Sequence, residues 1–130
     1  MVNKSFMNWV HEWNTKLYWN EDGTRAKPGF QAEEFWDEFK IKSWPKFQDA
    51  CAYHIPSKWV YDVRIFVKQV QDELKDRIAF AQIKEKFCRL TVYFNATDEE
   101  ARTRAHELIQ ECIDRLINKG VHPPKQEMEE

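Results

Sequence analysis

Glycine is scarce in this 130-residue chain, which has only three, at positions 23, 29 and 120. Phosphate-binding loops need closely spaced glycines, because the backbone must wrap tightly around a phosphate group. The spacing here excludes Walker-type and dinucleotide-binding loops. The motifs GxSxG, HExxH and CxxC are also missing from the sequence, which excludes the corresponding hydrolase, zinc-protease and paired-cysteine classes.

Cysteine and long apolar runs are scarce as well. The three cysteines, Cys51, Cys88 and Cys112, are odd in number and widely spaced, which is typical of reduced thiols in a cytosol. No run approaches the roughly 18 apolar residues of a membrane span, and the N-terminus lacks the pattern of a signal peptide. We therefore expect a cytoplasmic protein that does not associate with membranes.

Charge is nearly balanced, with 20 Lys and Arg against 22 Asp and Glu, which argues against nucleic acid as a partner. The length fits one domain, on a prior of about 100–200 residues per domain. We expect a single globular domain over residues 1–120 and a disordered acidic tail over 121–130. All six tryptophans lie in the first half of the chain, and we expect most of them to share one core.

Apolar spacing predicts an α+β fold that is mostly helical, with about four helices before a hairpin. The expected helices are 5–19, 31–42, a short one between Pro45 and Pro56, and a long one from 57 to 74. The long helix has the clearest periodicity, because its apolar residues recur every three or four positions. Its members are Trp59, Val63, Phe66, Val67, Val70 and Leu74.

A short antiparallel β-hairpin is expected near 78–95, with strands over 78–85 and 89–95, because apolar residues there alternate with period two. The alternative continues the preceding helix through Ile83 and Phe87, since no Gly or Pro marks a turn. A C-terminal helix follows, with Thr97 as the N-cap and Glu100 completing a capping box, and it ends at Gly120.

Several titratable groups are candidates for catalytic or metal-binding residues. Cys51 and His54 have metal-like spacing but no second pair, and the neighbours His11–Glu12 and His106–Glu107 do not face each other on a helix. A solvated helix face explains the acidic run Glu33, Glu34, Asp37 and Glu38 better than a cation site does. The sequence therefore predicts no catalytic residue, no metal and no cofactor.

Two clusters combine basic and aromatic residues, as sites for anionic, stackable ligands do. The first surrounds Trp44, with Lys40, Lys42 and Lys46. The second lies at the expected hairpin tip. The candidate ligand-binding residues are Lys84, Lys86, Arg89, Tyr93 and Trp44. Solvated surface charges remain the alternative interpretation of both clusters.

Residues 82–93, QIKEKFCRLTVY, resemble a QVKEKFGGLRFY-type box of small uncharacterised proteins of bacteriophages and bacterial genomes. Seven positions coincide, while Cys88 and Arg89 replace the two glycines of the box and Thr91 replaces its arginine. The cysteine pair that follows in many of these proteins has no counterpart here. The resemblance implies a small phage-type accessory protein that would work in the host cytoplasm, and it implies no activity.

These observations favour a non-enzymatic accessory protein that acts by binding. Its expected role is counter-defence, either by inhibiting a host protein or by sequestering a signalling nucleotide. The expected partner is therefore an anionic small molecule or an acidic host protein. Two alternatives stay open: a small enzyme that processes nucleotides or nucleic acid, and an assembly protein that self-associates. A homo-oligomer is also expected, because a lone hairpin leaves two strand edges without partners.

Overall fold

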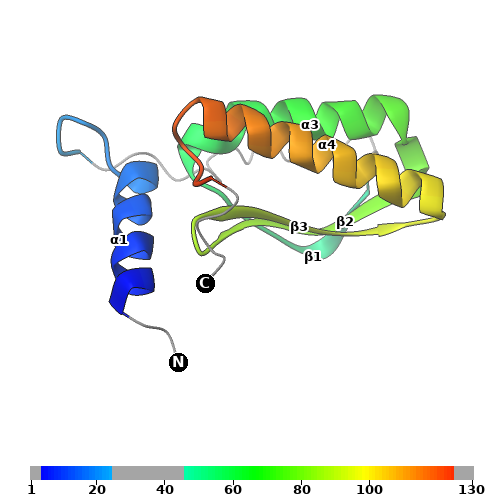
Figure 1. Cartoon of the computed structure of the whole chain (residues 1–130). Helices are drawn as coiled ribbons and strands as arrows, with labels where there is room; N and C mark the ends of the chain where they lie inside the picture. The colour runs from blue at the N-terminus through cyan, green and yellow to red at the C-terminus, as the bar shows by residue number, and fades with distance from the viewer. Residues whose placement is uncertain (1–3, 25–45, 125–130) are drawn as a thin grey trace.

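The computed structural model describes residues 4–24 and 46–124, which form three α-helices and a three-stranded sheet (Figure 1). The helices are α1 (Lys4–Tyr18), α3 (Val60–Glu73) and α4 (Glu99–Asn118). The strands are β1 (Lys46–His54), β2 (Ile78–Lys86) and β3 (Arg89–Ala96), and the short 3-10 turns η2 (Ser57–Trp59) and η3 (Lys75–Arg77) flank α3.

The sheet has the order β1-β2-β3 and mixes both pairing directions. β1 runs parallel to β2, and a parallel pair requires a crossover, which α3 supplies. β2 and β3 form the expected antiparallel hairpin, with Lys86 opposite Arg89 at the tip and Ile78 opposite Ala96 at the base. Helices α3 and α4 lie side by side on one face of this sheet (Figure 1).

The short helix expected between Pro45 and Pro56 is wrong, because residues 46–54 form strand β1. Its spacing also fits a helix, but pairing with a strand about 30 residues further along the chain decides its conformation. The helix expected over 31–42 lies outside the described residues. About four helices were expected before the hairpin, and the described residues contain two of them, α1 and α3.

The core lies between the helical layer and the sheet. The α3 residues Val63, Phe66, Val67 and Val70 are fully buried. Facing them are buried residues of the sheet and of α4: Ile78, Phe80, Ile83, Leu90, Ala101, Ala105, Leu108, Cys112 and Leu116. The hairpin is confirmed, and the alternative that continued the helix through Ile83 and Phe87 is wrong.

The ends of α4 show which local signals were correct. Asp98, not Thr97, is the N-cap, and its carboxylate accepts the Ala101 N–H at 2.9 Å. A carboxylate is the stronger acceptor, and Arg77 fixes it further with two hydrogen bonds. At the other end Gly120 has φ +76°, a left-handed conformation that glycine adopts without strain, and it ends the helix as expected.

The tryptophans do not form one core. Trp59 is fully buried, whereas Trp19 is 43% exposed and both Trp9 and Trp13 are only partly buried. Trp36 and Trp44 lie outside the described residues. The cause is the position of α1, which lies beside the hairpin tip and not against the length of α3 (Figure 1).

The segment after α4 is ordered as far as the structure describes it. His122 is 2% exposed and Pro123 is buried, so the expected disordered tail does not begin at residue 121. We refer to residues 121–124 as the C-terminal segment. None of the described helices combines the length and the apolar character that a membrane crossing would need.

Candidate functional site

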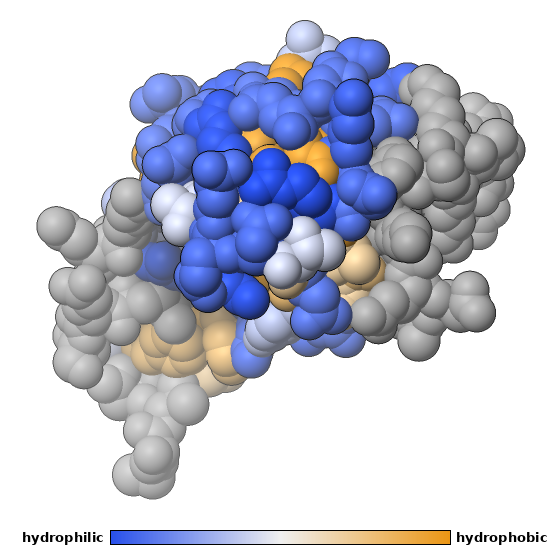
Figure 2. Space-filling view, turned by 90° about the vertical axis from the view of Figure 1, so that its right-hand side faces the viewer, coloured by the Kyte–Doolittle hydropathy of each residue, from blue (hydrophilic) through white to orange (hydrophobic). Residues whose placement is uncertain are grey.

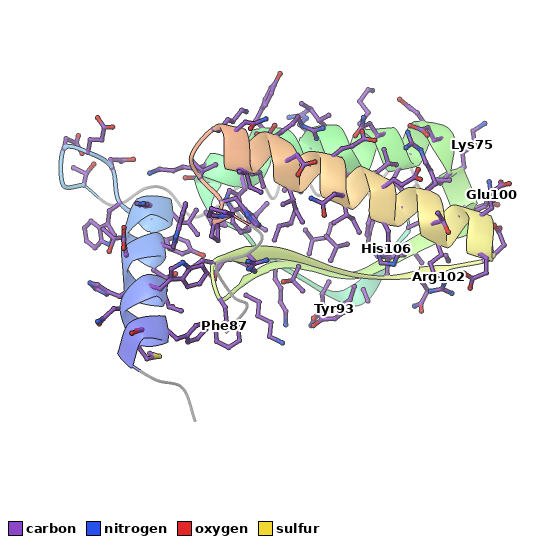
Figure 3. The ribbon with its side chains drawn as sticks, in the orientation of Figure 1. Lys75, Phe87, Tyr93, Glu100, Arg102 and His106 are labelled. Carbon is purple, nitrogen blue, oxygen red and sulfur yellow. The ribbon has the colours of Figure 1, made fainter. Side chains whose placement is uncertain are left out.

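The open face of the hairpin is the side of β2 and β3 that points away from α3 and α4. Ile83 is fully buried under the helices, so its neighbour Lys84 points to the other side. Tyr93 of β3 lies on the same side, and its side chain is 45% exposed (Figure 3). Lys84 Nζ is 5.5 Å from the centre of the Tyr93 ring, within the range of a cation–π contact. The structure therefore brings these two predicted site residues together.

The other predicted site residues are placed differently. Lys86 is exposed at the tip of the hairpin. Arg89 lies opposite it in the strand register, but its Nη2 atom donates a hydrogen bond to the Pro124 carbonyl at 3.0 Å. Arg89 is therefore used to hold the C-terminal segment, and the expected cluster of three cations contains two. Trp44 lies outside the described residues.

The hairpin turn has an unusual sequence for its geometry. Its two central residues, Phe87 and Cys88, have φ +51° and +69°. A two-residue turn with both central φ angles positive is usually built from Asn and Gly, because a Cβ is strained in this region. Phe87 is 49% exposed and contacts the ring of Phe6 from α1 at 5.7 Å between centroids (Figure 3). The turn thus holds an exposed aromatic ring at the end of the open face.

Glu85 connects this turn to α1. Its carboxylate accepts the Tyr18 hydroxyl at 2.8 Å and the Cys88 N–H at 2.7 Å. The Cys88 thiol lies 3.5 Å from the Val10 carbonyl of α1 and donates to it. These three contacts fix the backbone of the turn in spite of its strain, so the tip of the hairpin is a rigid feature.

The C-terminal segment contacts both layers through His122. Its Nε2 atom accepts the Leu90 N–H at 3.1 Å, which requires that the proton sit on Nδ1, where it reaches the Pro123 carbonyl at 2.8 Å. The ring packs against Trp59, whose Nε1 donates to the Val121 carbonyl at 2.6 Å. Burial lowers the pKa of His122 from its usual value of 6.5, although the contact with Pro123 opposes this shift. His122 is therefore neutral in the folded protein.

Stability is expected to fall on acidification because of this histidine. In the unfolded chain His122 takes up a proton near pH 6.5, whereas the lowered pKa of the folded state prevents it. The contribution of His122 to the free energy of unfolding is complete above pH 6.5. It decreases as the pH falls below that value, by at most about 1.4 kcal/mol per pH unit. Urea denaturation between pH 7.5 and 5 should show a steeper loss for the wild type than for His122→Gln. Equal slopes would contradict this assignment.

Cys88 and Cys112 are not arranged for nucleophilic chemistry. Burial, together with the nearby Glu85 carboxylate, raises the pKa of the Cys88 thiol to about 12. Burial also raises the pKa of the Cys112 thiol to about 12. Both thiols therefore stay protonated near neutral pH, where the thiolate is the reactive form. Among the side chains that the structure describes, those of residues 5–24 and 55–124, no three from His, Cys, Asp or Glu come together as a metal site.

An open cleft of about 600 Å³ lies at the other end of the domain, between the end of α3 and the start of α4. Figure 2 looks onto this end and shows a small apolar area ringed by hydrophilic side chains. Its two arginines are already paired, Arg77 with Asp98 and Glu100, and Arg104 with Glu73 and Glu107. The described site residues Lys84, Lys86, Arg89 and Tyr93 do not line this cleft.

Sequence reasoning placed Phe87 in the cluster at the hairpin tip but not among the candidate ligand-binding residues, and it missed the roles of Glu85 and His122. The resemblance offered a signal for the turn, because one of the two glycines of the phage box stands at position 88, where Cys88 has a positive φ. His122 lay in a segment whose prolines and acidic end suggested a tail, and a lone histidine there gives no local signal. Comparison of the chain with family models, with curated proteins and with solved structures finds no match.

Proposed function

We propose that this chain is a small non-enzymatic accessory protein of the phage type that binds an acidic surface of a host protein through the open face. The pair of Lys84, which is partly buried, and Tyr93, which is 45% exposed, carries the proposal. Tyr93 lies on the side of the sheet away from α3 and α4 (Figure 3), and Lys84 Nζ is 5.5 Å from the centre of its ring. A cation beside an aromatic ring binds a carboxylate and also offers apolar contact area.

Phe87 extends this surface at the tip of the hairpin. Strain at a turn persists only where its surroundings hold it, and such strain concentrates at functional sites. Phe87 has φ +51°, and its ring is half exposed. An exposed aromatic ring held rigidly is the kind of anchor that protein interfaces use. The resemblance of residues 82–93 to a phage box supports a counter-defence role in the host cytoplasm.

A protein partner fits the shape of the open face better than a nucleotide does. Small-molecule sites are concave and bury most of their ligand. The cleft between α3 and α4 is lined by none of the open-face residues. A sheet face that presents cations and aromatic rings suits a macromolecular surface, so we favour inhibition of a host protein over sequestration of a signalling nucleotide.

The test is a charge reversal on the open face, Lys84→Glu with Lys86→Glu. The matched control is Lys68→Glu with Lys75→Glu, which changes the net charge equally at two exposed lysines of α3 and η3. The probe is a fluorescent polyglutamate peptide, measured by anisotropy at low salt. We expect the open-face variant to bind at least about tenfold more weakly than the wild type, a difference of about 1.4 kcal/mol. The control should stay close to the wild type.

Equal binding by the two double variants would contradict the proposal, because attraction would then depend on net charge alone. A panel of cyclic and linear nucleotides separates the remaining outcomes. Saturable nucleotide binding that the open-face variant loses would replace the protein partner by a nucleotide. Turnover of any nucleotide would identify an enzyme and would overturn the proposal.

A further inference from the structure

The outer edge of β3 is the second surface that the hairpin presents. β3 is an edge strand, because β2 is its neighbour on one side and β1 lies beyond β2. The Leu90 N–H points outward, since it donates to His122 in the C-terminal segment. Backbone groups alternate along an edge strand, so the N–H groups of Val92 and Phe94 also point outward. In the part of the chain that the structure describes, no strand pairs with this edge.

The C-terminal segment covers only the first part of that edge. His122 takes the Leu90 N–H, and Arg89 holds the Pro124 carbonyl, so the segment ends beside the hairpin tip. At the other end the Thr97 N–H is bonded to Arg77, where the chain turns into α4. Five residues of the edge, 92–96, therefore lie between the part that the C-terminal segment covers and the part where the chain enters α4.

This stretch lacks the features that usually protect an edge strand. Natural edge strands carry lysines, prolines or bulges that prevent pairing with another chain. Residues 90–96, LTVYFNA, contain no charge and no proline. The irregularity of the hairpin lies in β2 between Phe80 and Gln82, which leaves β3 regular.

A row of α4 side chains, His106, Ile109 and Ile113, runs along the same edge, and we call this row the ledge. The His106 ring, labelled in Figure 3, makes an edge-to-face contact with the ring of Phe94, at 5.1 Å between centroids. Ile109 and Ile113 follow on the same side of α4 and are only partly buried. Any strand that pairs with β3 would cover these apolar side chains as well.

We propose that a second copy of this chain occupies the edge, with the two β3 strands antiparallel and centred on Phe94. The symmetric register places Val92 opposite Ala96 of the other copy, so the free stretch is used along its whole length. A longer strand from another protein would meet the C-terminal segment at one end. In this dimer two three-stranded sheets become one, and the α4 ledges face each other.

Charge also favours the antiparallel arrangement. The tip of the hairpin, residues 84–89, has three cations and one anion. The opposite end, residues 75–77 with 98–102, has four anions and three cations. Antiparallel pairing brings Arg89 of one copy toward Asp98–Glu100 of the other, so ends of opposite net charge approach each other twice. Parallel pairing would place like ends together.

The oligomeric state tests this proposal, measured by light scattering after gel filtration from micromolar to millimolar concentration. We expect the mass to rise from 15.8 kDa toward twice that value, and to fall again as salt is added. Amide hydrogen exchange gives the site. The Val92 and Phe94 amides should exchange more slowly at high concentration, whereas the inward Tyr93 amide should not change.

Two variants test the β3 edge and the ledge of α4 side chains separately. Val92→Pro removes an outward N–H, a position where proline is tolerated in an edge strand. Ile113→Glu places like charges between the ledges, and Ile65→Glu on α3 is its matched control. We expect the first two to be monomers with cooperative melting, and the control to dimerise.

A mass of 15.8 kDa at every concentration would overturn the proposal. A dimer that persists in Ile113→Glu, with no protection of the Phe94 amide, would overturn it too, whether or not Val92→Pro folds. The outcome is separate from that of the proposed function, because Lys84 and Lys86 lie on the open face and do not contribute backbone groups to the β3 edge.

Discussion

Trp59→Ala is expected to destabilise the protein by about 3–5 kcal/mol, the range for truncating a buried tryptophan. Trp59 is 0% exposed at the start of α3, and its ring packs against His122. Its indole N–H is also the donor to the Val121 carbonyl, so alanine would leave that acceptor without its partner. The stability decreases for two reasons: the substitution leaves a cavity in the core, and it releases the C-terminal segment.

Urea denaturation followed by circular dichroism measures this change. Trp19→Ala is the control, because Trp19 is 43% exposed and its loss should cost less than about 1 kcal/mol. A similar effect from both substitutions would show that residue size, and not burial in the core, determines the loss. A change below about 1 kcal/mol for Trp59→Ala would contradict the core described here.

Asp62→Asn is expected to cost about 1.5–3 kcal/mol, the range for hydrogen bonds that involve charged groups. The Asp62 side chain is 1% exposed between α3 and α4. It accepts hydrogen bonds from Lys119 Nζ at 2.6 Å and Arg115 Nε at 3.2 Å. Asparagine keeps the shape of the side chain but removes the charge, so both cations would lose a buried partner.

The two cations themselves are partly solvated, which limits the effect. Their side chains are 30% and 48% exposed, so water can replace part of what Asp62 supplies. Asp72→Asn, at an exposed position of the same helix, is the control and should change the stability by less than about 0.5 kcal/mol. Thermal and urea unfolding of the two variants at pH 7 distinguish a buried ion pair from a general charge effect.

Periodicity predicted those elements whose conformation is decided locally. The spacing of Val63, Phe66, Val67 and Val70 predicted α3, and these residues are all fully buried. Alternation predicted the hairpin, and its strands differ from the expected bounds by no more than one residue at either end. Such patterns work because one face of each element meets the core, so the period of the sequence follows the geometry of the element.

Pairing between distant segments was not predictable from local pattern. Strand β1 obtains its hydrogen bonds from β2 across α3, and nothing within its nine residues requires that pairing. The candidate site shows the same division. Alternation within β2 predicted Lys84 and Lys86 on one face, and the pairing of β2 with β3 adds Tyr93 to that face. The hydrogen bond from Arg89 to Pro124 depends instead on the path of the chain after α4. The path of the C-terminal segment is determined by the whole fold and not by local sequence.

The hydrogen bond between Trp59 and Val121 closes residues 59–121 into a loop whose first and last members touch. Within it lie α3, the hairpin and α4, so most of the core belongs to a continuous stretch of chain that meets itself at its own ends. Such a stretch is suited to open and close as one cooperative unit, to which β1 and α1 are added from outside. Because its ends are adjacent, this unit could be circularly permuted by joining them and cutting at a surface turn, without changing the arrangement of the core.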